Sequence, residues 1–226
     1  MITQKNTAII IPARLAATRL PNKPLIKIHD KTMIQHVWER ANESNLGRVI
    51  VATDSEEIKK IIENTGGVAC LTSIDHQSGT DRIYEALQKC DSENEIEYII
   101  NLQGDIPSID PHALSAVLKL LENKEVHIGT LVAKIRDESD LHKSQIVKAL
   151  CMFQENKINT KAINFERQPK DITINNLYHH IGIYSYTRDS LKQFVSLDQT
   201  NREKEEKLEQ LRALENNMHI EAGLID

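Results

Sequence analysis

Residues 7–13 read T-A-I-I-I-P-A, and this stretch decides how the rest of the sequence is interpreted. Its centre is a run of three isoleucines, which are β-branched, and Pro12 bounds the run. A short, continuous apolar run of this kind is typical of a strand that is buried on both faces, as in a parallel sheet. We therefore expect 7–13 to form the first, fully buried strand of such a sheet.

Similar apolar runs return three times in the first half of the chain, and a helical pattern lies between successive runs. Further strands are predicted at 48–53, 68–71 and 97–102. Between and after them, apolar side chains recur at the offsets of three and four residues that share one face of a helix. The predicted inner faces comprise Ile34, Val37, Trp38 and Ala41; Ile58, Ile61 and Ile62; Ile83, Ala86, Leu87 and Cys90; and Leu114, Val117, Leu118 and Leu121.

This alternation indicates the fold class. Strands that alternate with helices over short connections are typical of βαβ units, so we expect an α/β protein with a mostly parallel sheet flanked by helices. The second half has a different rhythm, with strands predicted at 127–134, 145–153, 158–164 and 179–186 and helices at about 187–195 and 201–216. We expect this half to be a mixed β extension of a single domain that spans 1–226.

The composition excludes several classes of protein. A chain of 226 residues is long enough to bury on the order of 70% of its unfolded surface without a disulfide or a metal. The longest purely aliphatic stretch, 8–11, is far shorter than the roughly 20 residues that cross a bilayer, and the polar start is unlike a signal peptide. The three cysteines form no CxxC pair, and a net charge of −5 argues against a general nucleic-acid binder. We expect a cytoplasmic globular protein.

The charge is distributed unevenly. The first 29 residues carry five cations and no acid, whereas the remaining 197 carry a net charge of −10. Three of these cations, Arg14, Arg19 and Lys23, fall in the loop after the first strand, at the edge where parallel sheets bind ligands. The loop has neither the GxGxxG nor the GxxxxGKS fingerprint. It is either a polyphosphate site or a solvated basic loop, and its position after a buried strand favours the phosphate site.

Three further loops or strand ends carry candidate side chains. Asp105 directly follows the fourth strand in N-L-Q-G-D, where it is either a ligand for Mg²⁺ or an ordinary turn residue. Asp54 holds the same place after the second strand, but we expect it to cap the following helix, with Ser55 as the alternative cap. The loop D-H-Q-S-G ends in Ser78 and Gly79, which either read a nucleobase or begin the next helix.

Two groups in the second half stay undecided on physical grounds. Strand alternation places His180 and Tyr184 on one face, where each is either a ligand contact or a structural residue. Glu209 and Gln210 lie in a charge-rich helix, and such charge runs usually form a solvated face. Neither group by itself distinguishes a binding site from ordinary structure.

Six segments, taken together and in order, form a pattern that covers nearly the whole chain. They are I-I-P-A-R-L-A-A-T-R-L-P-N-K-P-L at 10–25, V-I-V-A-T-D at 49–54, D-H-Q-S-G-T-D-R at 75–82, L-Q-G-D at 102–105, H-I-G-I-Y at 180–184 and L-E-Q-L-R-A-L at 208–214. Jointly they resemble the CMP-Kdo synthetases, that is, the 3-deoxy-manno-octulosonate cytidylyltransferases. The resemblance implies a Rossmann-like nucleotidyltransferase that is cytoplasmic, homodimeric and dependent on Mg²⁺.

The resemblance also implies a reaction and a set of site residues. CTP would transfer its cytidylyl group to the acid sugar Kdo, which releases pyrophosphate and yields CMP-Kdo for lipopolysaccharide biosynthesis. Residues 1–125 would bind the nucleotide, and 126–226 would bind the sugar and form the dimer. The implied residues are Arg14, Lys23 and Asp105 for catalysis, with Asp105 as the metal ligand; Arg14, Arg19, Lys23, Ser78 and Gly79 for the nucleotide; and Gln103, His180, Tyr184, Glu209 and Gln210 for the sugar.

The sequence departs from the family pattern in several places. Ile106 replaces an acid in Q-G-D-I-P, Asn164 and Glu166 do not match the family's Y-F-S-R although Arg167 does, and 144–149 keeps only part of its motif. The chain stops at Asp226, before the family's V-D-T-P-E-D-L motif with its second metal-binding aspartate. We expect one carboxylate to hold Mg²⁺ more weakly than two.

Two alternatives therefore stay open beside the active enzyme. One is a degenerate homologue that binds a nucleotide or dimerises without turnover. The other is a cytidylyltransferase for a different acid sugar, such as a sialic acid.

Overall fold

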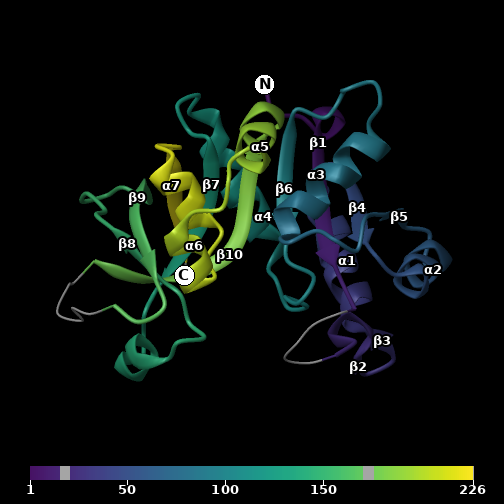
Figure 1. The fold of residues 1–226 in the computed structure, drawn as a ribbon, viewed down its shortest axis with the longest axis horizontal. Helices are drawn as coiled ribbons and strands as arrows, with labels where there is room; N and C mark the ends of the chain where they lie inside the picture. Colours follow the sequence, from purple (N-terminus) through teal and green to yellow (C-terminus); the bar gives the residue numbers. More distant parts are fainter. Residues whose placement is uncertain (16–20, 170–175, 226) are drawn as a thin grey trace. The chain divides into compact units, whose positions relative to one another are not determined.

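The chain divides into two compact units, residues 1–115 and 116–226, and each is described in turn. The structure is a computed structural model that describes residues 1–15, 21–169 and 176–225 (Figure 1). Within these residues, no helix is long and apolar enough to cross a membrane.

Unit 1 contains the predicted parallel sheet. β1 (Thr7–Ala13) pairs in parallel with β4 (Arg48–Thr53) and β6 (Tyr98–Leu102), and β4 pairs in parallel with β5 (Val68–Leu71). The resulting order β5-β4-β1-β6 reverses its direction of growth at β1, which is the arrangement of a doubly wound sheet. Residues 8–11 of β1 are fully buried, as the sequence predicts. The fold class is thereby confirmed.

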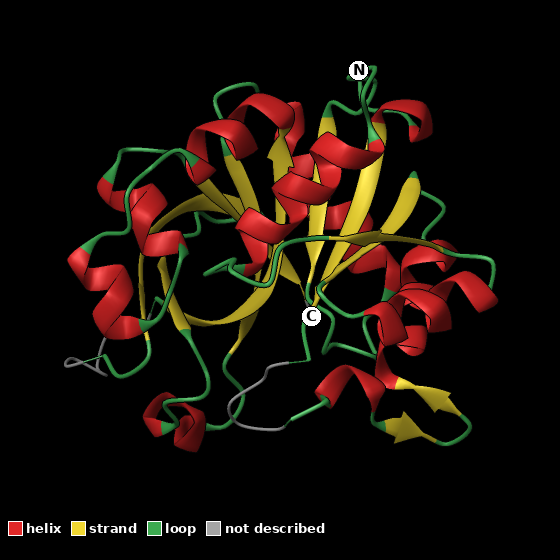
Figure 2. Ribbon diagram, turned by 45° about the vertical axis from the view of Figure 1, so that its right-hand side comes forward, coloured by secondary structure: helices red, strands yellow, loops and turns green. Residues whose placement is uncertain are grey.

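Three helices connect these strands. α1 (Met33–Glu43) and α2 (Glu56–Asn64) contact each other, and α3 (Gly79–Cys90) lies in front of β1 in Figure 1. Right-handed crossovers in this strand order place α1 and α2 on one face of the sheet and α3 on the other. A short 3-10 helix η1 (Gln4–Asn6) precedes the sheet, and the small pair β2 (Lys27–Ile28) and β3 (Lys31–Thr32) stands apart from it (Figure 2).

The predicted inner faces of these helices are largely confirmed. Most of their side chains are buried, but Trp38, Ile61 and Cys90 are only half-buried. The indole nitrogen of Trp38 is buried without a hydrogen-bond partner among the described residues. α4 (Pro111–Lys119) and the 3-10 helix η3 (Leu120–Glu122) follow, and their apolar positions are buried.

Unit 2 contains five strands that close on themselves. β7 (Ile128–Lys134) pairs with β10 (Leu177–Thr187) in the antiparallel and with β11 (Ile220–Ile225) in the parallel sense. β11 pairs with β9 (Asn159–Glu166), β9 with β8 (Lys148–Cys151), and β8 again with β10. The mixed character of this half is confirmed. β11 has no counterpart in the sequence prediction, and β8 is shorter than predicted.

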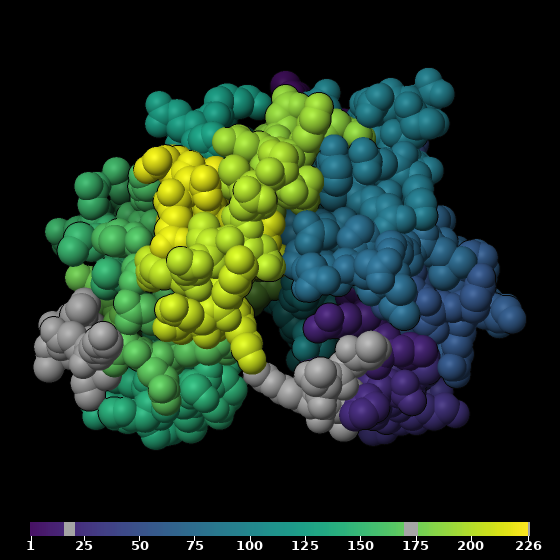
Figure 3. Space-filling view, viewed as in Figure 1, coloured from purple at the N-terminus to yellow at the C-terminus, as the bar shows by residue number. Residues whose placement is uncertain are grey.

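The helices of unit 2 cover one side of its strands, seen in light green and yellow in Figure 3. α5 (Arg188–Val195) packs on β10, and α7 (Gln210–Glu215) packs on β9 and on α6 (Asn201–Glu206). The 3-10 helix η4 (Glu138–His142) lies between β7 and β8 in the chain.

The prediction of a single helix at 201–216 is wrong, because the helix is interrupted between α6 and α7. Lys207 adopts the left-handed conformation with φ 55°. Arg167 fixes this corner, since its Nε donates to the carbonyl of Glu206 at 2.8 Å and its Nη2 to the carbonyl of Lys207 at 3.2 Å. The helical periodicity on both sides of the break hides it in the sequence.

Candidate active site

Two of the predicted catalytic residues lie together at the carboxyl edge of the sheet of unit 1. Lys23 begins the 3-10 helix η2 (Lys23–Leu25), which follows the loop after β1, and Asp105 follows β6. The Nζ of Lys23 lies 2.6 Å from the Oδ2 of Asp105, and their side chains are 34% and 49% exposed. β1 and β6 are neighbours where the strand order reverses, which is where open α/β sheets bind ligands.

The loop that carries the other predicted cations is closed at its base. The backbone N–H of Asn22 donates to the carbonyl of Leu15 at 3.3 Å, and Asn22 adopts a left-handed φ of 57°. Arg14 lies exposed immediately before this closure. Arg19 lies outside the described residues.

Small residues allow three segments to meet at this edge. A Cβ on Gly104 would lie 2.8 Å from the carbonyl oxygen of Pro12, too close for any other residue without a shift. A Cβ on Gly79 would lie 3.3 Å from the Cγ of Pro12 and 3.9 Å from the Oε1 of Gln103. The ends of β1 and β6 and the start of α3 thus come together, and the structure brings Gly79 beside Gln103.

Ser78 serves as the N-cap of α3. Its Oγ accepts from the backbone N–H of Asp81 at 3.2 Å and donates to the carboxylate of Asp81 at 2.8 Å. Of the two interpretations left open for this loop, the structure confirms the helix cap for the Ser78 side chain. Contact with a nucleotide stays a prediction for Ser78 and Gly79.

A buried amide orients Gln103, and the sequence interpretation missed it. Asn101 is fully buried in β6, accepts from the Nε2 of Gln103 at 3.3 Å and donates to the Oγ1 of Thr80 at 3.3 Å. A polar residue in the middle of the otherwise apolar run Tyr98–Leu102 is the sequence signal for this role.

A buried ion pair supports the base of the loop after β1. Arg82 donates to the Oδ2 of Asp54 at 2.9 Å and to the Oγ1 of Thr72 at 2.6 Å, and the side chains of Arg82 and Asp54 are only 3% and 8% exposed. The other carboxylate oxygen of Asp54 accepts the backbone N–H of Leu15 at 3.4 Å. The expectation that Asp54 caps α2 is therefore wrong: Ser55 is the cap, with its Oγ accepting from Ile58. A charge this deeply buried needs a partner, and Arg82 supplies it.

The single carboxylate of Asp105 fits a magnesium ion that is also bound by substrate phosphates and waters. Among the described residues, no group of three or more histidine, cysteine, aspartate or glutamate side chains is placed to share a metal. Mg²⁺ is commonly held by one or two carboxylates together with substrate phosphates and waters. The partly exposed carboxylate of Asp105 suits that mode.

In unit 2, three of the predicted sugar-binding residues form one cluster. The rings of His180 and Tyr184 are 5.5 Å apart, and Phe165 packs edge-on to His180 at 4.9 Å. The hydroxyl of Tyr184 donates to the Oε1 of Gln210 at 3.2 Å. His180, Tyr184 and Gln210 are all buried. Of the two interpretations left open for Gln210, the solvated face therefore does not hold.

A bulge in β10 preserves this arrangement. The register against β7 shifts between Ile181 and Tyr184, where two extra residues enter β10. An insertion of two keeps His180 and Tyr184 on the same face, as alternation predicts. Thr130 fills the bulge, since its hydroxyl donates to the carbonyl of Ile183 and lies 2.9 Å from the Nε2 of His180.

The burial of these groups determines their protonation. Burial, with a smaller effect from the charge of His179, lowers the pKa of His180 to about 3, so the ring is neutral at neutral pH. Burial, followed by the negative charge of Glu209, raises the pKa of Tyr184 well above its usual value. The cluster is therefore an uncharged set of hydrogen-bonding groups beside one carboxylate.

One polar atom of the cluster lacks a protein partner. The Nε2 of Gln210 is buried and has no hydrogen-bond partner among the described residues, because Tyr184 occupies only the Oε1 of the same amide. A buried donor without a partner costs about 1–3 kcal/mol. An oxygen atom of a bound ligand would satisfy this donor.

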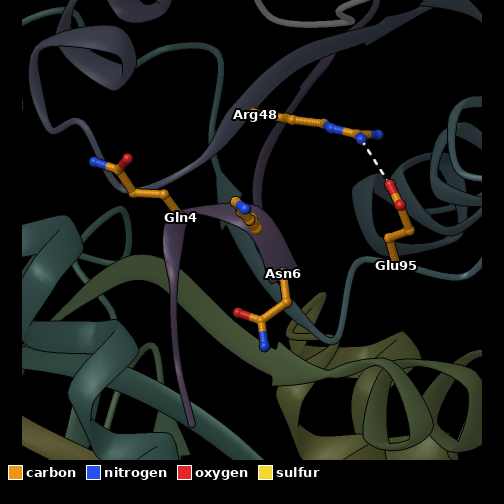
Figure 4. Close-up of a pocket in the computed structure, with 5 residues that line it drawn as sticks. Gln4, Asn6, Arg48 and Glu95 are labelled. Atoms are coloured by element: carbon orange, nitrogen blue, oxygen red, sulfur yellow. Dashed lines mark hydrogen bonds and ion pairs between the residues drawn. The ribbon is translucent and has the colours of Figure 1, made fainter.

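A separate pocket lies at the opposite edge of the unit 1 sheet (Figure 4). It has a volume of about 330 Å³ and is lined by Gln4, Lys5, Asn6, Arg48 and Glu95, with Arg48 and Glu95 joined at 2.9 Å. These residues precede or begin the strands, so the pocket is at the amino edge. None of the predicted site residues lines it.

The fold and the carboxyl-edge site define a class of protein. The chain combines a doubly wound sheet with a lysine–aspartate pair at its switch point. A family model described as Cytidylyltransferase matches residues 8–220 of this chain. The protein is therefore a nucleotidyltransferase. The 3-deoxy-manno-octulosonate cytidylyltransferases of Paramagnetospirillum magneticum and Brucella anthropi are 44% and 45% identical over 96% and 100% of this chain, covering 89% and 90% of their own lengths. The chain belongs to the family of 3-deoxy-manno-octulosonate cytidylyltransferases.

Solved structures agree with this placement. A CMP:2-keto-3-deoxy-manno-octonic acid synthetase complexed with CTP matches 97% of this chain and 89% of its own, with 34% identity and a TM-score of 0.85. A cytidylyltransferase from Leptospira borgpetersenii matches 95% of this chain and 74% of its own with a TM-score of 0.59. At 19% identity, this second similarity concerns the fold alone.

Proposed function

We propose that this protein transfers the cytidylyl group of CTP to 3-deoxy-manno-octulosonate (Kdo) and releases pyrophosphate. The observation that carries the proposal is the pairing of Lys23 with Asp105 at the sheet edge where such folds bind nucleotides. Family membership supports both the donor and the acceptor. The product would enter lipopolysaccharide biosynthesis, in the cytoplasm, where the free thiols of the chain would stay reduced.

In the proposed reaction, the anomeric hydroxyl of Kdo gives up its proton to solvent, and its oxygen attacks the α-phosphorus of CTP in line. The bond from the α-phosphorus to the bridging oxygen breaks, and pyrophosphate leaves. Arg14 neutralises the charge that develops on the α-phosphate, and Lys23 neutralises the leaving pyrophosphate, with Arg19 as a further phosphate contact. This chemistry depends mainly on positioning and on charge neutralisation.

The remaining unit 1 residues orient the nucleotide and the reacting groups. Gly79, which packs against Pro12, and Ser78 at the start of α3 would contact the nucleotide. Gln103, oriented by Asn101, would contact the sugar. Asp105 would hold Mg²⁺, which supplies additional positive charge to the phosphates when it is bound.

The unit 2 cluster would take the acid sugar. Gln210 offers a buried amide N–H without a protein partner, and Tyr184 and neutral His180 surround it with groups that bind sugar hydroxyls. Glu209 would accept from a hydroxyl of the sugar. Residues 126–226 would also form a homodimer, which sedimentation equilibrium tests by a mass of twice 25.7 kDa.

The deciding experiment measures pyrophosphate release from CTP, Kdo and Mg²⁺. Asp105→Asn is expected to lower kcat/KM by at least about 100-fold, which corresponds to roughly 2.7 kcal/mol. Glu95→Gln is the matched control, because Glu95 is also an exposed carboxylate paired with a cation, but at the amino edge. It should stay within about twofold of the parent, a difference of roughly 0.4 kcal/mol.

Two outcomes would contradict the proposal. CTP binding without any pyrophosphate release, in the parent as in the variant, would identify a nucleotide-binding homologue without turnover. Faster release with a different acid sugar, such as a sialic acid, would identify another acceptor.

A further inference from the structure

One lysine of unit 2 is fully buried, although lysine is among the residues that are almost never buried. Lys148 begins β8, and its Nζ donates to the carbonyls of Lys143 and Ile146 at 2.8 Å each and to that of Arg167 at 2.7 Å. Burial lowers the pKa of Lys148, and the charge of Asp140 acts against this effect. Three acceptors engage all three N–H groups of an ammonium, whereas a neutral amine has only two. The geometry therefore indicates a buried ammonium.

The three carbonyls belong to two separate segments of the chain. Lys143 and Ile146 lie between η4 and β8, and Arg167 follows β9. β8 and β9 pair in the antiparallel sense, with Lys148 opposite Glu166. The ammonium thus fastens the segment before β8 to the segment after β9. Hydrogen bonds from a charged donor are roughly twice as strong as those between neutral groups, so this is a strong connection.

Arg167 carries the connection to the corner between α6 and α7. It is half-buried, and its Nη1 donates to the carbonyl of Ser144 at 3.2 Å, in the segment that Lys148 also holds. Its Nε and Nη2 donate to the carbonyls of Glu206 and Lys207 at the corner itself. A chain of hydrogen bonds therefore runs from the buried ammonium through Arg167 to this corner.

The corner immediately precedes two predicted sugar-binding residues. Lys207 has a left-handed φ of 55°, and Glu209 and Gln210 follow it in the chain. The Nε2 of Gln210 is the buried donor without a partner among the described residues. The position of this donor depends on where α7 begins, and the contacts of Arg167 join that point to the end of β9.

Lys148 also lies beside the backbone of a third predicted sugar-binding residue. The backbone N–H of His180 donates to the carbonyl of Val147, the residue before Lys148, at 2.9 Å. The start of β8 therefore contacts the strand that carries His180 and, through Arg167, the corner before Gln210.

We propose that Lys148 is a positioning residue of the sugar site. Its ammonium fixes the backbone of Arg167, from which the guanidinium reaches the corner and sets the place of the Gln210 amide. Lys148 itself would not touch the sugar. The inference rests on the proposed function for the identity of that sugar.

The first test is the kinetic effect of Lys148→Met, which keeps a long side chain but removes its charge and its donors. KM for Kdo should rise at least about tenfold, while KM for CTP stays within about twofold of the parent. Lys161→Met is the matched control, because Lys161 is an exposed lysine on the neighbouring strand β9, and both KM values should stay within about twofold. Equal rises in the two KM values of Lys148→Met would indicate a merely structural role and overturn the proposal.

The second test does not depend on activity. Amide hydrogen exchange of the parent and of Lys148→Met, without substrates, should be about tenfold faster in the variant for peptides that cover 203–211, and equal for peptides that cover 188–195 on α5. Unchanged protection at the corner would refute the connection. A parent that releases no pyrophosphate would contradict the proposed function alone, because hydrogen exchange would still decide the role of Lys148.

The third test breaks the connection at its middle. Arg167→Gln leaves the backbone carbonyl that Lys148 contacts and removes the contacts of the guanidinium with the corner. It should give the same selective rise in KM for Kdo, and an unchanged KM would overturn the proposal even where Lys148→Met does not fold. The double variant should show no larger effect than the more severe single variant, since both act on one connection. Effects that multiply would show that Lys148 does not act through Arg167.

Discussion

At the scale of single residues, the predicted site residues of the two units differ in charge and in burial. In unit 1, Lys23 and Asp105 form a partly exposed ion pair at the sheet edge. In unit 2, His180 and Tyr184 are buried and uncharged. The first arrangement suits a polyphosphate, which brings many charges, and the second suits the hydroxyls of a sugar.

The hydroxyl of Tyr184 has a testable role because it donates a hydrogen bond to the amide oxygen of Gln210. Tyr184→Phe keeps the ring but releases that amide, so KM for Kdo is expected to rise about three- to tenfold, or roughly 0.7–1.4 kcal/mol, while KM for CTP stays unchanged. Steady-state kinetics with each substrate varied in turn measures this. Tyr178→Phe, on the same strand but outside the cluster, is the control. A rise in KM for CTP alone would contradict the assignment.

The lowered pKa of His180 predicts a pH dependence of stability. The native ring takes up its proton only near pH 3, whereas the unfolded ring does so near pH 6.5. The unfolded state therefore binds more protons between these values, and stability is lost as the pH falls from about 6.5 towards 3. The loss should reach about 2 kcal/mol at pH 5. Urea unfolding at pH 7 and pH 5 measures it.

Two variants separate this effect from general acid denaturation. His180→Gln should remove most of the difference between the two pH values, because the substituted side chain does not titrate. His112→Gln, at an exposed position on α4, should leave it as in the parent. Equal pH dependence in all three proteins would show that His180 is not responsible.

At the scale of elements, a buried ion pair holds α6 against α7. Arg212 donates to both carboxylate oxygens of Glu203, at 2.6 and 2.8 Å, and lies over the ring of Phe194 at 4.8 Å. The side chains of the pair are 3% and 5% exposed. This contact fixes the start of α7, where Gln210 lies.

Loss of one partner should leave a buried charge without its counterion. Glu203→Gln is expected to lower the free energy of unfolding by about 3 kcal/mol or more. Glu215→Gln is the control, because its pair with Arg202 spans 3.9 Å and is more exposed, and such pairs contribute under about 1 kcal/mol. Chemical denaturation of both variants decides the matter. Similar losses of unfolding free energy in the two variants would mean that burial does not make the Glu203–Arg212 pair more important for stability.

The sequence predicts the elements of unit 1 well because each signal there is local. The runs at 7–13 and 48–53 are continuous and apolar, and Ser55 and Pro111 stand at helix starts. Unit 2 is harder to predict because its signals are not local. β11 forms a strand because it pairs with β7, which is far away in the sequence.

The candidate site follows the same division. The place of Asp105 at a strand end is readable from the sequence, and so is the cation-rich loop. The buried roles of Arg82 and Asn101 are not, because polar residues carry no signal of burial until their partners are known. Asp54 shows this most clearly. Its position before a helix predicts an N-cap, whereas in the structure it forms an ion pair with Arg82.

At the scale of the whole molecule, the uneven charge has a kinetic consequence. Arg14 and Lys23, two of the five cations in the first 29 residues, lie at the proposed nucleotide site. CTP carries several negative charges, whereas Kdo carries a single carboxylate. Salt shortens the screening length from about 10 Å at 0.1 M to 3 Å at 1 M. KM for CTP should therefore rise more steeply with KCl concentration than KM for Kdo. Parallel slopes for the two substrates would argue against a cationic nucleotide site.

The position of the single tryptophan makes the protein its own reporter. Trp38 lies on α1 in unit 1, with its indole nitrogen buried, and the chain has no other tryptophan. Its fluorescence therefore reports the loosening of the first unit, whereas far-ultraviolet circular dichroism reports the helices and strands of both units. Coincident or separate transitions in these two signals tell whether the units unfold in one cooperative step or one after the other.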